Sequence, residues 1–282
     1  MTDSLVDLHM HTTYSDGRLS PEELVRLLQR QGVRVAAITD HDSVDGLGRA
    51  FKEAELIPEL TLVSGVEISA DHPEQPGSDV HILGYFVDTD DDAFQAQLSA
   101  LRNERHNRAS EMVNRLRGYG YQIEMTRVEE IAGDAGIGRP HVARALVEKG
   151  YIGTVREAFQ GLLDEGGIAY SNRPHISMPS AVDLIKRAGG AAVLAHPLYA
   201  QKHERLIELA ADAGMAGIEV HYASFTSAQR RSLNRLAETR GLLSLGGSDY
   251  HGIGYEDEYQ PGSAGPSIDA VTELSKLSGR KG

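Results

Sequence analysis

Short apolar runs rich in β-branched residues recur along the chain, and stretches with apolar residues at helical spacing separate many of them. Runs of this length indicate buried strands, and the intervening stretches indicate amphipathic helices. We expect seven strands, over residues 5–8, 33–38, 60–66, 80–86, 192–195, 217–220 and 242–245. Strand–helix alternation is typical of a parallel sheet, and seven such strands favour a barrel.

The clearest helix signal follows the first predicted strand. Ser20 suits the N-cap, Pro21 the first helical position and Glu23 the third, and apolar residues then keep helical spacing as far as Gly32. The same pattern recurs over residues 180–188 and 201–213. The mostly polar tail is expected to form a terminal helix or a loose end.

One stretch breaks this alternation. From about residue 90 to residue 166 the pattern is almost wholly helical, with a long amphipathic helix expected over 94–116. Shorter helices are expected around Glu129 and over 139–149 and 155–163. We therefore predict a helical cap over residues 91–166, inserted into a barrel built from residues 1–90 and 167–282.

Composition narrows the class of protein. The 282 residues carry 28 Lys plus Arg against 41 Asp plus Glu, a net charge of −13, and they include no cysteine. A disulfide scaffold, a thiolate nucleophile and a cysteine-bound metal are excluded. The acidic charge disfavours a protein that coats long nucleic acid. We find no apolar run long enough for a bilayer and no secretory signal, so we expect a cytoplasmic protein with no stable protein partner.

Histidines and carboxylates gather at the ends of the predicted strands. Side chains at the C-terminal ends of barrel strands converge on one face, so we expect these residues to meet there. They are His9, His11, Asp16, His41, Glu67, His81, His196, His221, Asp249 and His251.

Such a group needs a cation. Carboxylates packed together without one raise each other's pKa values at a cost of several kcal/mol. Neutral imidazoles with carboxylates, and no thiolate, suit Zn, Mn or Fe. The ligands are too many for one ion, and they suit two or three ions that share a bridging carboxylate and a bridging hydroxide.

Single histidines are open to plainer explanations. His72, His106 and His203 are expected at the surface. His81, taken alone, fits a half-buried structural histidine as well as a ligand. His221 fits equally a residue behind the ligands, a substrate contact or a surface position.

The segments DLHMHTTYSDG, ITDHD, GVEIS, AHP and GSDYH together resemble the motifs of PHP-domain (polymerase and histidinol phosphatase) phosphoesterases. The resemblance implies an α/β fold, a distorted (β/α)7, TIM-like barrel, and a trinuclear centre that often holds Mn, Fe or Zn. It implies Glu67 as the bridging carboxylate. The implied ligands are His9, His11, Asp16, His41, Glu67, His81, His196, Asp249 and His251. Every ligand position is filled, which indicates an active enzyme.

The cap segment GIGRPHVARAL resembles the branch of this family that dephosphorylates nucleoside 3′,5′-bisphosphates, some members of which trim the 5′ ends of short RNA. Its Gly-rich turn into a helix leaves backbone N–H groups that favour an anion. Arg139 and His141 are therefore candidate phosphate contacts, although a plain helix start with an exposed arginine is the alternative. Asn107, Arg108 and Arg173 are weaker candidates.

These observations predict a metal-dependent phosphatase, with Mn as the expected metal and a small nucleotide as substrate. A metal-bridging hydroxide would attack the phosphorus, and His196, Asp249 or His251 would pass a proton to the leaving oxygen. Two enzyme alternatives are a 5′→3′ exonuclease on short RNA and a histidinol phosphate phosphatase. A non-catalytic metal or nucleotide sensor is disfavoured by the complete ligand set. A C–N hydrolase is disfavoured because Glu67, and no lysine, ends the third strand.

Overall fold

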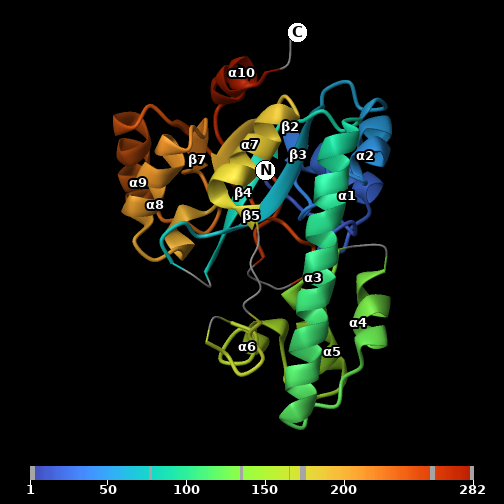
Figure 1. The fold of residues 1–282 in the computed structure, drawn as a ribbon. Helices are drawn as coiled ribbons and strands as arrows, with labels where there is room; N and C mark the ends of the chain where they lie inside the picture. The colour runs from blue at the N-terminus through green and yellow to red at the C-terminus, as the bar shows by residue number, and fades with distance from the viewer. Residues whose placement is uncertain are drawn as a thin grey trace.

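The computed structural model describes residues 4–75, 78–133, 136–164, 166–171, 176–254 and 258–279. A single curled sheet lies at the centre of these residues, with helices around it (Figure 1). Its strands run in the order β1-β2-β3-β4-β6-β7-β8, and the short β5 pairs with β3. The strands are β1 (Val6–Asp7), β2 (Val35–Ile38), β3 (Thr61–Asp71), β4 (Asp79–Tyr85), β5 (Ile176–Ser177), β6 (Ala191–Leu194), β7 (Gly217–Glu219) and β8 (Leu243–Leu245).

The expectation of a wholly parallel sheet is wrong at one strand. β4 runs antiparallel to both of its neighbours, β3 and β6, whereas the pairs on either side of this trio are parallel. Only residues 72–78 separate β3 from β4. A parallel connection needs a dozen residues or more, so this short link forces the chain to reverse. The short β5 was also not expected.

The sheet curls back on itself where β1 and β8 end. Met10 forms an isolated parallel bridge with Tyr250, and the His11 backbone N–H donates to the Tyr250 carbonyl at 2.9 Å. The result is the distorted barrel of the α/β class that the sequence predicts.

The helices begin where local signals place them. At α1, Ser20 and Glu23 form the expected capping box, and Gly32 ends the helix with a φ of 77°. Helices α2 and α9 were not among the expected segments. The helices outside the cap region are α1 (Pro21–Gln31), α2 (Leu47–Ala54), α7 (Met178–Arg187), η1 (Pro197–Tyr199), α8 (His203–Asp212), α9 (Ser227–Thr239) and α10 (Ile268–Leu277). Among the described residues, no helix combines the length and the apolar character needed to cross a membrane.

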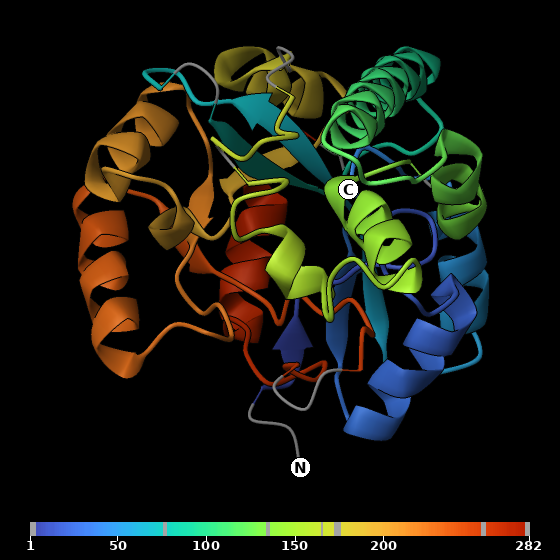
Figure 2. The same cartoon turned by 90° about the horizontal axis from the view of Figure 1, so that it is seen from below.

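Four helices form a lobe below the sheet in Figure 1, and Figure 2 shows α5 and α6 in front of the sheet when seen from that side. They are α3 (Asp92–Gly118), α4 (Met125–Ala132), α5 (Arg139–Glu148) and α6 (Val155–Ala158). The lobe has an apolar core of its own, but α3 belongs to two cores. Phe94 and Leu98 pack into the core of the barrel, whereas Met112 and Leu116 pack into that of the lobe. The division at residues 90/91 and 166/167 stays a prediction.

Candidate metal centre

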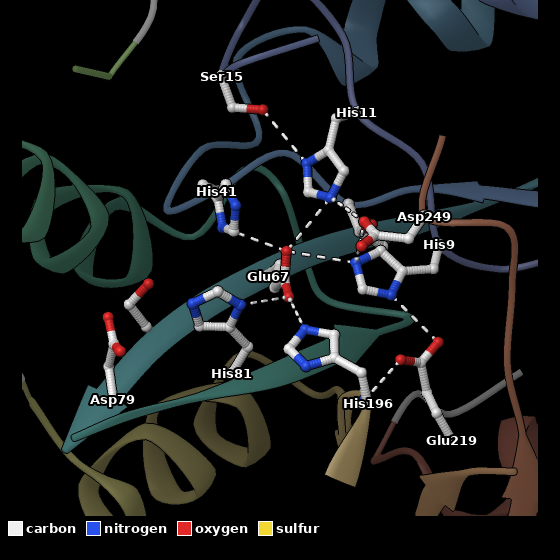
Figure 3. A network of polar contacts seen from close by, with 12 residues as sticks. His9, His11, Ser15, His41, Glu67, Asp79, His81, His196, Glu219 and Asp249 are labelled. Atoms are coloured by element: carbon white, nitrogen blue, oxygen red, sulfur yellow. Dashed lines mark hydrogen bonds and ion pairs between the residues drawn. The ribbon is translucent and has the colours of Figure 1, made fainter. Parts of the chain in front are cut away.

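Glu67 lies on β3 at the middle of a cluster of histidines (Figure 3). Its side chain is only 1% exposed. Ring nitrogens of five histidines lie within 3.3 Å of its carboxylate: His9 (3.3 Å), His11 (3.2 Å) and His41 (3.1 Å) at Oε2, and His81 (2.9 Å) and His196 (3.2 Å) at Oε1. Both oxygens of one carboxylate are therefore shared among several possible metal ligands.

Two further carboxylates extend the cluster. Asp249 Oδ1 lies 3.2 Å from His9 Nε2 and 3.1 Å from His11 Nε2. Asp16 Oδ1 lies 3.3 Å from His251 Nε2, and Asp16 Oδ2 lies 3.9 Å from the Nε2 atom of His41. All nine residues that the family resemblance implies as ligands thus form one connected group, although their roles as ligands stay predictions.

Buried carboxylates outside the cluster hold its loops in place. Asp40 accepts hydrogen bonds from the Thr12 N–H at 2.7 Å and from the hydroxyls of Thr12 and Ser15 at 2.6 and 2.5 Å. These bonds fix the loop that carries His11 and Asp16. Asp7 accepts from the backbone of His9, Ser248 and Gly262 in the same way, and burial raises the pKa of Asp7 to about 6.

A carboxylate and a carbonyl orient two of the rings. Glu219 Oε1 lies 3.1 Å from His9 Nδ1, and Glu219 Oε2 accepts from the His196 N–H at 2.8 Å. The carbonyl of Asp249 accepts from His251 Nδ1 at 2.8 Å. A donor proton on Nδ1 leaves the Nε2 lone pair of each ring toward the cluster, which is the usual arrangement of metal-binding histidines. Glu219 comes at the end of the sixth predicted strand, but our sequence analysis gave it no role, since a single acidic residue there does not show which rings it contacts.

Several buried atoms of the cluster make no hydrogen bond within the described residues. They are His9 Nε2, Asp16 Oδ1, His41 Nδ1 and His81 Nδ1. These atoms lie 2.9–3.3 Å from other polar atoms of the cluster but without hydrogen-bond geometry. A buried polar atom without a hydrogen bond is costly, and a cation bound between these atoms would remove that cost. Three groups have ligand atoms within 4.8 Å of one another: His11, Asp16, His41 and His251; His9, His11 and Glu67; and His41, Glu67 and His81. The residues fit divalent ions, whose number and identity stay predictions.

The carboxylates and the histidines of the cluster shift each other's pKa values. Burial alone would raise the pKa of Glu67, but charge interactions with His41 and His81 outweigh it and hold the pKa well below its ordinary value. His9 and His251 do the same for the pKa of Asp249, again against burial. Burial also holds the pKa of His41 well below its usual range. The carboxylates raise the pKa of His9, His196 and His251 against the effect of burial, so a metal ion that binds these rings would displace their protons.

A cavity of about 260 Å³ separates the cluster from helices α3 and α5. Arg105, Arg108 and Arg139 line its far side. Arg105 bonds to the carboxylate of Asp42 and donates to the Ser69 hydroxyl at 2.6 Å. Three cations therefore face the cluster across one small space, and our sequence analysis had not singled out Arg105.

The structure brings Arg139 to the cavity but not His141. The His141 side chain is buried, and its Nδ1 accepts a hydrogen bond from the Gly138 N–H at 2.9 Å. Burial lowers the pKa of His141 to about 4, so the ring is neutral. In this structure His141 caps the start of α5 and does not line the cavity, so its role as a phosphate contact stays a prediction that the geometry does not support.

Of the other predicted contacts, Arg108 lines the cavity, whereas Asn107 and His221 do not. Asn107 is exposed and does not line the cavity, because Arg105 and Arg108, three residues apart, mark the side of α3 that faces it. His221 is not among the lining residues either. Arg173 lies outside the described residues. His72 is buried, not exposed as expected, and its Nδ1 accepts from the Glu74 N–H at 3.1 Å.

Comparison with known proteins agrees with this geometry. The family described as PHP domain matches residues 7–223. A 5′-3′ exoribonuclease of Haemophilus influenzae is 34% identical over 87% of this chain and 89% of its own length. A 3′,5′-nucleoside bisphosphate phosphatase of Chromobacterium violaceum is 33% identical over 96% of this chain and 93% of its own length.

A solved structure from Bifidobacterium adolescentis, whose description proposes a metal-dependent phosphoesterase, covers 97% of this chain and 96% of its own at a TM-score of 0.87 and 30% identity. The fold, the cluster and the relatives point the same way. The chain belongs to the PHP domain family of metal-dependent phosphoesterases.

Proposed function

We propose that this phosphoesterase removes the 3′-phosphate of nucleoside 3′,5′-bisphosphates, converting 3′-phosphoadenosine 5′-phosphate to AMP. The observation that carries the proposal is the pairing of two unlike sites across one cavity: a cluster suited to metal ions and a group of arginines. A substrate with two phosphates places one at each side. The named bisphosphate phosphatase of Chromobacterium violaceum, similar over nearly the whole chain, supports it.

The cluster side would carry the chemistry. Bound divalent ions supply a Lewis acid for the phosphoryl oxygens and lower the pKa of a bound water. Asp16, Glu67, Asp249 and the surrounding histidines would hold these ions, with Glu67 in contact with the largest number of rings. His196, Asp249 and His251 line the cavity, and a histidine of the three that is free of metal would give the leaving oxygen its proton, since Asp249 is held in its anionic form.

The opposite side would select the substrate. Arg139 lies at the first turn of α5 and Arg108 on α3, and both guanidinium groups reach the cavity. Arginine binds phosphate through paired N–H donors, which fix its position as well as its charge. The second phosphate, held there, would orient the reacting phosphate toward the cluster.

A 5′→3′ exonuclease on short RNA is the second candidate. A further cavity of about 310 Å³ shares Asp79, His81, Arg139, Phe159, His196 and Tyr199 with the first. This gives room for more than one nucleotide beside the cluster, and Phe159 and Tyr199 offer rings on which a base could stack. The relative from Haemophilus influenzae carries that name.

The test is phosphate or nucleotide release, with added Mn, from four substrates: the adenosine bisphosphate, AMP, histidinol phosphate and a 5′-phosphorylated RNA pentamer. We expect the bisphosphate to react fastest and AMP to accumulate. Faster cleavage of the pentamer would establish the exonuclease instead, and reaction of histidinol phosphate alone would overturn both. Absence of turnover on all four would favour a sensor.

The arginines give the proposal a sharper form. Arg139→Ala is expected to raise KM for the bisphosphate about 10- to 100-fold and to leave KM for a simple phosphate monoester nearly unchanged. Arg205→Ala is the matched control, since Arg205 is a surface arginine that pairs with Glu74 and Glu208. An equal loss with both substrates would mean that Arg139 does not read the second phosphate.

A further inference from the structure

Asp79 places a negative charge among the arginines of the cavity. It is the first residue of β4 and stands two residues before His81. Side chains two apart on a strand project to the same face, roughly 7 Å apart along it. Asp79 therefore faces the same cavity as the metal cluster, and its side chain is 18% exposed.

One oxygen of this carboxylate is shared by two arginines. Asp79 Oδ2 lies 3.5 Å from Arg108 Nη1 and 3.3 Å from Arg139 Nη2. The Nε atom of Arg108 donates to the Ser171 carbonyl at 3.1 Å, and the Arg139 guanidinium stacks 5.8 Å from the ring centre of Phe159. The contacts with Asp79 therefore use outer guanidinium nitrogens, which are the atoms that would bind a phosphate.

The two arginines need a counter-charge. Burial lowers the pKa of Arg108, the charge of Arg139 lowers it further, and Asp79 works in the opposite direction. Asp79 thus offsets the repulsion between the two cations. Arg105, by contrast, pairs with Asp42, a different carboxylate.

We infer that Asp79 is an internal counter-anion that competes with the second phosphate of the substrate for Arg108 and Arg139, an inference that rests on the proposed function. An incoming dianionic phosphate displaces the carboxylate from the two guanidinium groups. After hydrolysis, the carboxylate competes with the phosphate that the product AMP still carries, and so favours its release. Asp79 makes the subsite weaker for any anion and faster to empty.

The test is Asp79→Asn, which keeps the shape of the side chain and removes its charge. Two affinities are measured: that of AMP as a product inhibitor of the Mn-loaded enzyme, and that of inorganic sulfate for the metal-free protein by calorimetry. A partly exposed ion pair is weak, so we expect both anions to bind about 3- to 10-fold more tightly. KM for the bisphosphate is expected to fall by a similar factor.

Two controls make the result specific. Asp183→Asn changes the net charge equally at an exposed position on α7, outside this cavity, and is expected to leave both affinities unchanged. In a triple variant that adds Arg108→Ala and Arg139→Ala to Asp79→Asn, the gain in sulfate affinity is expected to be lost. A gain that persists without both arginines would overturn the inference.

Weaker sulfate or AMP binding in Asp79→Asn would also overturn it, because Asp79 would then hold the arginines in position for the phosphate. Unchanged affinities would show that the carboxylate does not compete at all. Failure of the proposed function would give a different set of results. Tighter sulfate binding without a preference for bisphosphates would support the role of Asp79 and contradict the proposed substrate. A preference for bisphosphates with unchanged affinities in Asp79→Asn would support the substrate and contradict the role of Asp79.

Discussion

The two sides of the cavity are built in different ways. The metal cluster consists of side chains on β3 and β4 and in the loops that follow the other strands, with Glu67, expected at a strand end, inside β3. Several of its buried atoms make no hydrogen bond within the described residues. The arginines lie on helices of the lobe, and each already contacts a carboxylate. The cluster therefore needs a cation from outside to be satisfied, whereas the arginines must exchange one partner for another. We expect the first side to govern reaction and the second to govern choice of substrate.

The largest effect is expected on the cluster side, from Glu67→Gln. An amide cannot supply the charge that Glu67 shares among five histidines, so we expect metal loss and a fall in turnover of roughly 1,000-fold or more. Mass spectrometry measures the metal loss, and phosphate release measures the fall in turnover. Removal of metal from the unaltered protein by a chelator is expected to have the same effect, with recovery on adding Mn.

Glu74→Gln is the matched control for this change, because Glu74 is a half-exposed carboxylate paired with Arg205. It is expected to retain both metal and activity. Full activity of Glu67→Gln at its normal metal content would contradict the central place that we give to Glu67.

A smaller effect is expected one layer behind the ligands, from Glu219→Gln. The amide can accept only one of the two hydrogen bonds that orient His9 and fix the His196 backbone. We expect metal affinity to fall about 10- to 100-fold, with much of the turnover restored at saturating Mn. Isothermal titration with Mn measures this. Unchanged affinity would mean that Glu219 supports only the fold.

On the lobe side, the low pKa of His141 makes the stability of the folded protein depend on pH. That pKa is about 4 in the folded protein against an ordinary value of 6.5, so the folded state binds fewer protons between these values. Stability from His141 is therefore lost as pH falls through 6.5 toward 4, by about 1 kcal/mol between pH 7.5 and pH 5.5. The free energy of unfolding in urea, measured at both pH values for the unaltered protein and for His141→Gln, gives the part of this loss that is due to His141. Identical pH slopes in the two proteins would contradict it.

The smallest effect is expected from Asn107→Ala, on the exposed side of α3. KM and kcat for the bisphosphate are expected to stay within about twofold, since surface substitutions remote from a site change little. A larger rise in KM would show that α3 presents more than one side to the substrate.

The cluster could be predicted from sequence because its residues sit in short local motifs on strands or in the loops that follow them. Loops that follow neighbouring strands lie on the same side of a curled sheet, so His9, His41 and Asp249 come together with Glu67. Capping was equally local: Ser20 and Glu23 are three residues apart and needed no tertiary information.

The features that the sequence did not predict depend mostly on packing between segments that are distant in the chain. Which side of α3 faces the cavity is set by its contacts with both cores, so the sequence could not separate Asn107 from Arg105. The burial that makes His141 a neutral cap arises in the same way. The reversal of β4 had a local cause in its short link, which the regular pattern of strands and helices concealed.

The shared helix α3 also sets a length. It runs for 27 residues, about 40 Å at 1.5 Å per residue, and its two ends are anchored in different cores. Arg105 and Arg108 lie between these anchor points. Because the helix is uninterrupted and packed into a core near each end, it holds Arg105 and Arg108 at a constant distance from Glu67. A substrate would then be selected when the distance between its two phosphates matches the distance between the arginines and the metal cluster.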